Sequence, residues 1–443
     1  MNELPARNLI GGQWRFPAGP FEFEIRNPAD GTVSAVVPLS SRFDLTEAIG
    51  AARAAVDDGT RPWAPAAQRW RLLDRVLNRM ISRSAELAQV QATETGLSAQ
   101  DSHAVLAATL DQAGSLLRAA AADGRQSGSG GVSGHVLSWG LPFTEIITSV
   151  WPSLLCGASV VVKPSLRGAL TPVSFGLLTD DLPDGVVNIV QGTGVDVGAD
   201  LIGRRELTAL YVRAGERTRA QARRARERTG VPLHTLRAGG NVLVLGPDGG
   251  PDLDLIAGAV AGAVRIHNAG GPYGLPLLAV HRELEQPVLD AVVSRLSGTL
   301  AAPLPTEPLR QRAVRRINAL LEAGATAVLG GPGWPDDAIH RMGWRLPPTV
   351  LRLGSPASVR VQRGCEPLGP VLGVITWSDP GELAGALTGP RSPDGTAVLC
   401  GVEPGLADRL PHGRVVPVAG SEVGPLLLGA PGMLPETWTR VLG

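Results

Sequence analysis

The chain has 443 residues, 44% of them apolar, and its 41 Lys and Arg are balanced by 41 Asp and Glu. This length predicts two or three domains, and a formal charge of zero excludes a global field that would attract nucleic acid or an anionic membrane. The longest apolar runs, such as LLAV and ASVVV, are far shorter than a membrane span.

The first part of the chain reads as two strands followed by a helical block. FEIRNPADGTVSAVVPL predicts two strands around an Asn-Pro-Ala-Asp-Gly turn. Helical patterns follow at about 43–57, 65–95 and 98–122, and the last of these opens with a Ser98-x-x-Asp101 capping box. DGRQSGSGG, at 123–131, is typical of a flexible linker.

After the linker, short unbroken Val/Ile/Leu strands alternate with helices, which favours a parallel sheet covered on both faces. We expect strands at 134–139, 158–164, 186–192 and 208–212, and helices near 144–155, 172–178, 197–202 and after Gly215. A second α/β unit begins near Gly239 and runs to about Val418.

The helix after Gly215 is rich in arginine, with seven arginines between Arg213 and Arg228. It could present a basic face to phosphate, coenzyme A or an acidic partner. The interpretation we favour is a solvated helix in which Glu216 and Glu227 form local ion pairs.

The cysteines and the basic residues also constrain the protein. Cys156, Cys365 and Cys400 lie far apart, in neither metal-ligand nor disulfide spacing, and the N-terminus has no basic-then-apolar signal pattern. We therefore expect a cytoplasmic protein with no metal and no membrane partner. Lys163 is the only lysine among the 41 basic residues, which suggests that this position needs a compact ammonium. The alternative is that a lysine stands at this position by chance.

One run of the sequence matches a known pattern without gaps: LSWGLPF, a helix, then PSLLCGASVVVKPS. It resembles the Pro-Trp-Asn-Phe-Pro and Pro-Ala-Leu-x-x-Gly-Asn-x-Val-Val-x-Lys-Pro-Ser-Glu runs of the aldehyde dehydrogenase superfamily. Further matches, in family order over residues 8–375, are Asn27-Pro28 with Gly31, Glu94-Thr95-Gly96, LPDGVVNIVQGTGVDVG, AGGN at 238–241, Asn268-x-Gly270 and Glu366-Pro-Leu-Gly-Pro-Val.

This resemblance implies an α/β fold with a Rossmann-like cofactor domain and an α/β catalytic-type domain. We expect the first at 1–123 and 132–238, a flexible linker at 124–131 in place of the family's long hairpin, the second at 239–418, and a C-terminal tail at 419–443. The tail also lacks the family's last strand, so we expect a reduced oligomerisation flap. The family's usual dimer and tetramer are then in doubt, although a homo-oligomer built on other helices stays open.

The same resemblance allows the family's chemistry to be checked position by position. The family's nucleophilic cysteine falls at Tyr273 here, its general-base glutamate at Arg237, and its oxyanion asparagine at Gly140. A phenol has a higher reference pKa than a thiol, and a guanidinium cannot accept a proton. Loss of one oxyanion donor alone typically costs about 10²–10³ in rate. We therefore expect the thiohemiacetal route to be absent.

Several roles remain open for the residues of this pocket. Tyr273 either fills a disused pocket or transfers a proton, and Arg237 either pairs with a structural acid or binds an anion. His267 and Asn268 are the other pocket positions. Cys365, beside Glu366, is a weak candidate for a displaced nucleophile, because free cysteines are more often core residues.

The resemblance also implies a site for NAD or NADP. Lys163 and Glu366 match residues that bind the two riboses, and Trp139 matches the floor of the nicotinamide region. Arg213 replaces the glycine that lets pyrophosphate approach a helix N-terminus, so it changes the shape there while adding positive charge. A shifted dinucleotide or another phosphorylated ligand is then possible.

Three functions follow from the sequence. The one we favour is an auxiliary or non-catalytic protein that binds a nucleotide or small anionic ligand, beside an active paralogue. The second is an enzyme with repurposed chemistry that uses Tyr273, His267, Arg237 or Lys163. The third is an NAD(P)-dependent aldehyde oxidoreductase with an unrecognised nucleophile.

Overall fold

The computed structural model divides the chain into two compact units, and the described residues carry the α/β alternation that the sequence predicts. It describes residues 7–56, 62–123, 130–236, 240–268, 274–333, 342–364, 368–389, 395–412, 414–420 and 423. Unit 1 comprises the described residues of 7–27 and 32–236, and unit 2 comprises those of 28–31 and 240–423. Of the predicted linker at 124–131, residues 124–129 lie outside the described part of the chain.

Unit 1 is built on a seven-stranded sheet in the order β2-β1-β7-β6-β5-β8-β9, in which β5 to β9 are parallel. Its strands are β1 (Asn8–Ile10), β2 (Gln13–Arg15), β5 (Val132–Val136), β6 (Ser159–Lys163), β7 (Val187–Ile189), β8 (Ala209–Arg213) and β9 (Leu233–Leu236). The antiparallel strands β1 and β2, with β2 at the edge of the sheet, were not expected from the sequence, because each has only three residues. The hairpin of β3 (Glu22–Arg26) and β4 (Val33–Pro38) matches the prediction.

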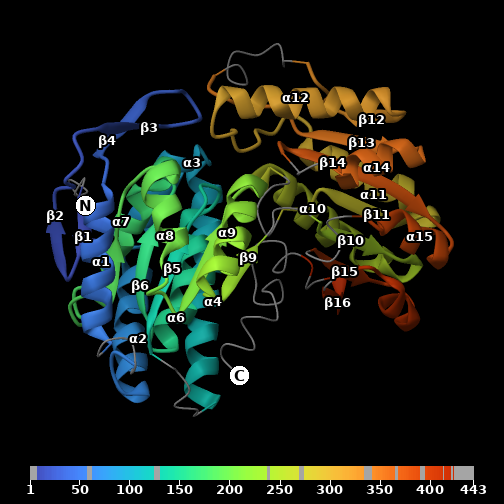
Figure 1. The fold of residues 1–443 in the computed structure, drawn as a ribbon. Helices are drawn as coiled ribbons and strands as arrows, with labels where there is room; N and C mark the ends of the chain where they lie inside the picture. Colours follow the sequence, from blue (N-terminus) through green and yellow to red (C-terminus); the bar gives the residue numbers. More distant parts are fainter. Residues whose placement is uncertain are drawn as a thin grey trace. The chain divides into compact units, whose positions relative to one another are not determined.

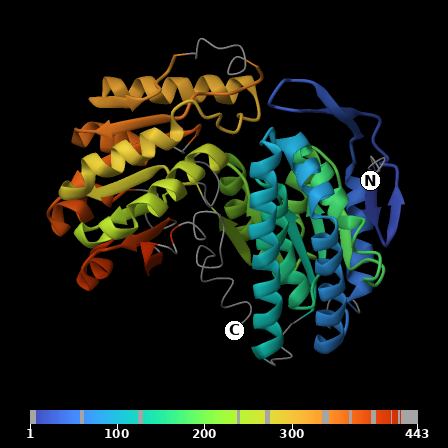
Figure 2. The same ribbon diagram turned by 180° about the vertical axis from the view of Figure 1, so that it is seen from behind.

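Helices cover both faces of this sheet (Figures 1 and 2). On one face lie α1 (Arg42–Ala55), α8 (Ala199–Gly203) and α9 (Glu216–Thr229). On the other lie α5 (Pro142–Glu145), the π-helical turn η2 (Ile146–Val150), α6 (Trp151–Leu155) and α7 (Leu170–Gly176), backed by α2 (Ala66–Ser82), α3 (Ser84–Thr95) and α4 (Ala99–Asp123). The second face of the sheet is therefore two helical layers deep.

Two helical predictions are corrected by the structure. The pattern at 65–95 predicts one helix, but the backbone leaves the helical region at Arg83 and two helices, α2 and α3, result. The pattern at 144–155 predicts one α-helix, but its middle turn is the π-helical η2. π-Helical turns occur frequently at functional sites. This one carries Thr148, whose backbone carbonyl accepts a hydrogen bond from Arg213.

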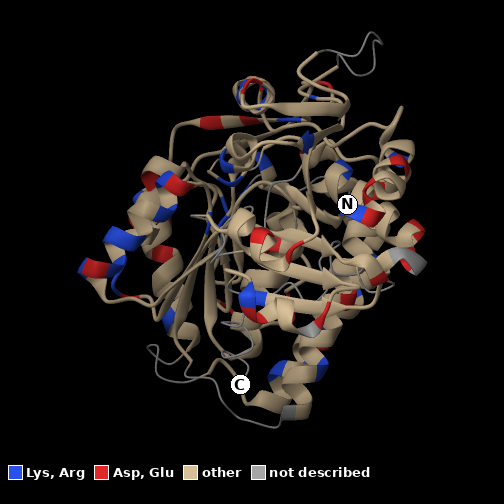
Figure 3. Cartoon of the chain, turned by 90° about the vertical axis from the view of Figure 1, so that its right-hand side faces the viewer, with Lys and Arg blue, Asp and Glu red and all other residues tan. Residues whose placement is uncertain are grey.

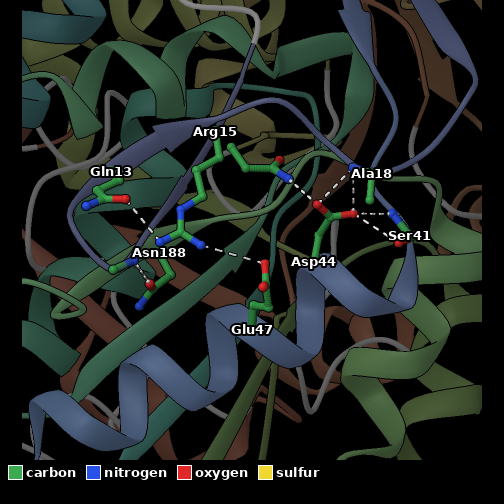
Figure 4. A network of polar contacts seen from close by, with 9 residues as sticks. Gln13, Arg15, Ala18, Ser41, Asp44, Glu47 and Asn188 are labelled. Atoms are coloured by element: carbon green, nitrogen blue, oxygen red, sulfur yellow. Dashed lines mark hydrogen bonds and ion pairs between the residues drawn. The ribbon is translucent and has the colours of Figure 1, made fainter.

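Polar contacts tie the N-terminal strands to α1 (Figure 4). Asp44, in the first turn of α1, accepts from the backbone N–H of Ser41 at 2.8 Å and from that of Ala18 at 3.1 Å. Ser41 caps the helix in return, which completes a capping box. Arg15 of β2 pairs with Glu47 at 3.8 Å. Asn8 of β1 also donates to Asp44 at 3.4 Å, so each of the two short strands has a polar contact with α1.

Unit 2 has its own seven-stranded sheet, in the order β12-β13-β14-β11-β10-β15-β16, parallel except for β12. Its strands are β10 (Val242–Leu245), β11 (Leu277–His281), β12 (Ala325–Leu329), β13 (Thr349–Leu353), β14 (Val371–Trp377), β15 (Thr396–Cys400) and β16 (Arg414–Val418). Its helices are α10 (Leu253–His267), α11 (Glu285–Leu296), α12 (Glu307–Glu322), α14 (Pro356–Gly364) and α15 (Pro380–Leu387). Separate apolar clusters lie on the two faces of the sheet.

Candidate functional site

The strand order of unit 1 reverses between β5 and β8. From β5 the chain builds outward through β6 to β7, and then returns to add β8 and β9 on the other side of β5. Open α/β sheets bind ligands outside the carboxyl ends of their strands at such a switch point. Three of the four predicted cofactor-binding residues lie at these ends: Lys163 ends β6, Trp139 follows β5, and Arg213 ends β8. The fourth, Glu366, lies outside the described residues.

Lys163 is a buried cation. Its side chain is 5% exposed, and its aliphatic stem passes η4 (Gly194–Gly198), where a Cβ built on Gly198 would lie 3.5 Å from Cδ of Lys163. Burial lowers the pKa of Lys163 to about 8. Among the described residues, no carboxylate forms an ion pair with this ammonium. A buried cation without a charge partner costs free energy, which an anionic or hydroxyl-rich ligand would offset.

Trp139 is positioned by its indole N–H, which donates to the backbone carbonyl of Glu94 in α3 at 3.0 Å. The Glu94 carboxylate accepts from the backbone N–H groups of Leu170 and Thr171 and, at 2.7 Å, from the Thr171 hydroxyl. Glu94 thus connects the segment after β5 with the first turn of α7. Burial is the larger influence on this carboxyl group and raises its pKa to about 7, against the opposing effect of the three hydrogen bonds.

Arg213 does not project from the strand end as the sequence suggested. Its guanidinium turns inward toward α5 and η2, where Nη2 donates to the backbone carbonyl of Thr148 at 2.9 Å. Its Nε lies 3.7 Å from Oε2 of Glu145, and both side chains are 5% exposed. The positive charge expected for a phosphate is therefore paired with a carboxylate of the same chain.

Sequence reasoning missed Glu145. It is held by Ser138, the second residue after β5, whose hydroxyl donates to Oε1 at 2.9 Å. The signal was present, since Glu145 is the single acid in the apolar run PFTEIITSVWPSLL. Burial raises the pKa of Glu145, and the charge of Arg213 opposes that rise.

The arginine-rich helix α9 has the local pairing that the sequence favoured, at least around Glu216. Arg219 is fully buried and pairs with Glu216 at 2.6 Å, and Arg223 pairs with the same carboxylate. These two hydrogen bonds lower the pKa of Glu216 to about 2. Acidic and basic positions are interspersed along the helices in Figure 3, in agreement with the zero net charge.

In unit 2, the predicted pocket residues His267 and Asn268 lie at the end of α10. His267 is the last helical residue and is buried. Asn268 caps the helix with a left-handed φ of 51°, and its amide donates to the carbonyls of Ala302 at 2.8 Å and Pro303 at 3.1 Å. These contacts tie the end of α10 to the segment at 302–303, and the role of Asn268 in the pocket stays a prediction.

The other two pocket residues, Arg237 and Tyr273, lie outside the described residues. In sequence they precede β10 and β11, and Glu366 precedes β14; these three strands are parallel neighbours. Asn241, just before β10, connects the beginnings of β10 and β11 with β15, because its amide N–H₂ donates to Gly274 O at 2.9 Å and its amide oxygen accepts from Thr396 N at 3.0 Å. The catalytic roles of Arg237 and Tyr273 stay predictions.

Two of the three cysteines are poorly suited to nucleophilic attack. Burial raises the pKa of Cys156, at the end of α6, to about 11. Burial and the neighbouring Asp252 also raise the pKa of Cys400 in β15. Cys365 lies outside the described residues. Among the described residues there is no cluster of three His, Cys, Asp or Glu that could hold a metal ion, and no helix long and apolar enough to cross a membrane.

Comparison with known proteins decides the family. The model of the aldehyde dehydrogenase family matches residues 14–385. The chain belongs to this family. It is 29% identical to a 2-hydroxymuconic semialdehyde dehydrogenase of Pseudomonas sp. (strain CF600) over 80% of this chain and 79% of that protein. It is 27% identical to a 3,6-anhydro-alpha-L-galactose dehydrogenase of Streptomyces coelicolor, over 85% and 80% of the two chains.

Solved structures confirm the aldehyde dehydrogenase fold. The chain matches aldehyde dehydrogenase C of Pseudomonas syringae, a C291A mutant in complex with NAD+ and octanal, with a TM-score of 0.81 and 25% identity over 94% of this chain and 89% of that one. Betaine aldehyde dehydrogenase of Staphylococcus aureus, in complex with NAD+, matches with a TM-score of 0.82 and 20% identity over 94% and 87%. The predicted fold class is therefore confirmed.

Proposed function

We propose that unit 1 binds a nicotinamide dinucleotide, NAD or NADP, at the carboxyl ends of β5, β6 and β8. The observation that carries this proposal is Lys163, the only lysine in the chain, buried at the end of β6 without a described carboxylate beside it. A ribose hydroxyl or a phosphate oxygen at this ammonium would satisfy a group that is otherwise costly to bury.

The surrounding residues fit such a ligand. Trp139 offers an aromatic surface whose orientation the Glu94 carbonyl fixes. The backbone of η4 packs against the Lys163 stem, because a Cβ built on Gly198 would lie in ordinary van der Waals contact with Cδ of Lys163. When bound, the dinucleotide supplies a hydride acceptor. The chain's own contribution at this edge is to orient that ligand and to exclude water from it.

For the activity, the names of the relatives favour an NAD(P)-dependent aldehyde oxidoreductase over a non-catalytic role, because both relatives named above are dehydrogenases. A covalent version of this reaction needs a thiolate. The raised pKa values of Cys156 and Cys400 argue against both. By elimination we propose Cys365 as the nucleophile of any covalent route.

A second candidate is favoured by a different observation. The ion pair between Arg213 and Glu145 is that observation, and the sequence resemblance adds to it by implying Gly140, Arg237 and Tyr273 at the positions of the family's oxyanion donor, general base and nucleophile. This combination fits an auxiliary protein that binds a nucleotide or small anionic ligand, with an active paralogue or a second copy of this chain as partner. A repurposed enzyme that uses Tyr273, Arg237, His267 or Lys163 is the remaining alternative.

One set of measurements separates these functions. Binding of NAD+ and NADP+ to the purified full chain is measured by calorimetry, and formation of NAD(P)H is followed with a panel of aliphatic, aromatic and semialdehyde substrates. The oxidoreductase proposal expects aldehyde-dependent NAD(P)H formation that iodoacetamide abolishes. It also expects loss of activity in Cys365→Ala but not in the matched control Cys156→Ala.

Each other outcome has a defined meaning. Activity that survives alkylation and Cys365→Ala contradicts the covalent route and favours repurposed chemistry, which Tyr273→Phe and Arg237→Ala then test. Dinucleotide binding without turnover of any aldehyde favours the auxiliary role. Absence of binding at millimolar NAD+ and NADP+ overturns the proposal as a whole.

A further inference from the structure

The ion pair between Arg213 and Glu145 lies across the switch point of the unit 1 sheet. Arg213 ends β8, and Glu145 ends α5, the helix that follows β5. Ser138, after β5, donates to Glu145, and Arg213 donates to Thr148 in η2. The two side chains therefore join the carboxyl ends of the two strands between which a ligand of this fold class binds.

This pair is poorly satisfied for a buried one. The approach of Nε to Oε2, at 3.7 Å, is longer than a hydrogen bond. Nη1 of Arg213 and Oε2 of Glu145 are both buried and have no hydrogen-bond partner. Buried charges are normally bound by several short hydrogen bonds. The Nη1 amino group of Arg213 and one carboxylate oxygen of Glu145 are thus left for another partner.

The local field at Arg213 suits an anion. Arg213 stands two residues before Gly215, the N-cap of the fourteen-residue helix α9, so the positive end of that helix lies beside it. The guanidinium fork matches the geometry of phosphate oxygens and can bind two of them at once. The Glu145 carboxylate, by contrast, approaches the guanidinium at one point only, with Oε2 3.7 Å from Nε.

We propose that Glu145 is an internal competitor for an anion site whose cation is Arg213. A phosphate or pyrophosphate group entering at the carboxyl ends of β5 and β8 displaces the carboxylate from the guanidinium. Glu145 keeps the Ser138 hydroxyl as its partner, and the guanidinium rotates about its own side-chain bonds to the anion. The pair therefore weakens anion binding in the resting protein. This inference deepens the proposed function, since the anion would be the pyrophosphate of the dinucleotide.

The test measures binding rather than turnover. Inorganic pyrophosphate and NAD+ are titrated by calorimetry into the full-length wild type and into Glu145→Gln, which removes the charge and keeps the shape. We expect Glu145→Gln to bind both ligands at least about tenfold more tightly, because the competing carboxylate is gone. In Glu145→Gln/Arg213→Gln this gain is lost. Without ligand, Glu145→Gln melts at a lower temperature than the wild type, and pyrophosphate restores more of its stability.

Glu216→Gln is the matched control. It removes one carboxylate from the first turn of α9, but from the Arg219 and Arg223 pairs rather than from Arg213. An equal gain in ligand affinity in Glu216→Gln would show that any lost carboxylate near α9 has this effect, and would overturn the proposal. Unchanged ligand affinity in Glu145→Gln would also overturn it. If that variant does not fold, Glu145→Asp, which shortens the side chain, is expected to give a smaller gain, and no gain there overturns the proposal.

The two ligands separate this inference from the proposed function. NAD+ binding that Glu145→Gln does not change leaves the proposed function standing and removes this inference. Pyrophosphate binding that Glu145→Gln strengthens, with no NAD+ binding to any variant, supports the inference and removes the proposed function.

Discussion

The indole N–H of Trp139 donates to the backbone carbonyl of Glu94 at 3.0 Å, while the Glu94 side chain accepts the donors that open α7. One residue of α3 therefore positions both Trp139, which lies at the candidate nucleotide site, and the first turn of α7. Neither contact requires Glu94 to touch a ligand, so its role is a positioning one.

Glu94→Gln should lower the free energy of unfolding by about 1–3 kcal/mol, because an amide N–H₂ would then face backbone N–H donors. The effect has a predictable pH dependence. The folded-state pKa of Glu94 is raised from 4.5 to about 7, so its contribution is fully present near pH 4.5 and is lost as the pH rises through 7. The stability difference between wild type and variant should therefore be larger at pH 5 than at pH 8, as measured by urea unfolding. Thr171→Val removes a hydrogen bond that lowers the pKa of Glu94, so its loss of stability should be larger at pH 8 than at pH 5, opposite to that of Glu94→Gln.

Lys163→Met should affect thermal stability and NAD+ binding in different ways. Removing a buried charge without a described ion-pair partner should leave the melting temperature unchanged or raise it, whereas affinity for NAD+ should fall by about tenfold or more. Wild-type affinity should also decline above pH 8, as the ammonium with its lowered pKa loses its proton, and Lys163→Met should show no such decline. Calorimetry at pH 7 and pH 9 checks both statements. Equal affinity in the two proteins would remove Lys163 from the site.

A stack of three rings crosses β5, β8 and β9. Tyr211 lies 4.8 Å from His135 and 4.6 Å from His234 between ring centroids, nearly parallel to both. Burial lowers the pKa of both histidines, that of His135 to about 3, and raises the pKa of Tyr211 to about 12, so the rings are neutral at pH 7. Tyr211→Leu should cost about 2–4 kcal/mol of unfolding free energy, and Tyr211→Phe, which keeps the stack, clearly less. Both free energies are measured by unfolding in guanidinium chloride. Equal losses in Tyr211→Leu and Tyr211→Phe would show that the hydroxyl group, and not the ring stack, stabilises the fold.

Asn268 combines a backbone constraint with two hydrogen bonds, and two substitutions separate them. Asn268→Gly keeps the left-handed φ of 51° accessible but loses the contacts to Ala302 and Pro303, whereas Asn268→Ala also strains the backbone. Asn268→Ala should therefore be less stable than Asn268→Gly by about 1 kcal/mol. Thermal unfolding of both variants checks this order, and the reverse order would contradict a strained cap at this position.

The sequence predicted much of the fold because its signals are local. Unbroken Val/Ile/Leu runs predicted the parallel strands β5 to β8, and the Ser98-x-x-Asp101 capping box predicted the start of α4, where Asp101 N donates to Ser98 Oγ at 3.0 Å. The break at Arg83 and the π-helical turn in η2 were missed, since both interrupt helical patterns that continue on each side. The strands β1 and β2 were missed because three residues carry no periodicity.

By itself, the sequence determined the family, the α/β architecture and the positions at which Lys163, Trp139 and Arg213 fall, because gapless spacing and strand periodicity follow from the order of the residues. Only the tertiary structure decided what these side chains meet. It joined Arg213 of β8 to Glu145 of α5, left Lys163 buried without a described carboxylate beside it, and tied Trp139 to Glu94. Such partners lie tens of residues apart in the chain. Whether a charge is paired depends on how parallel strands and their covering helices bring those residues together, which no local pattern records.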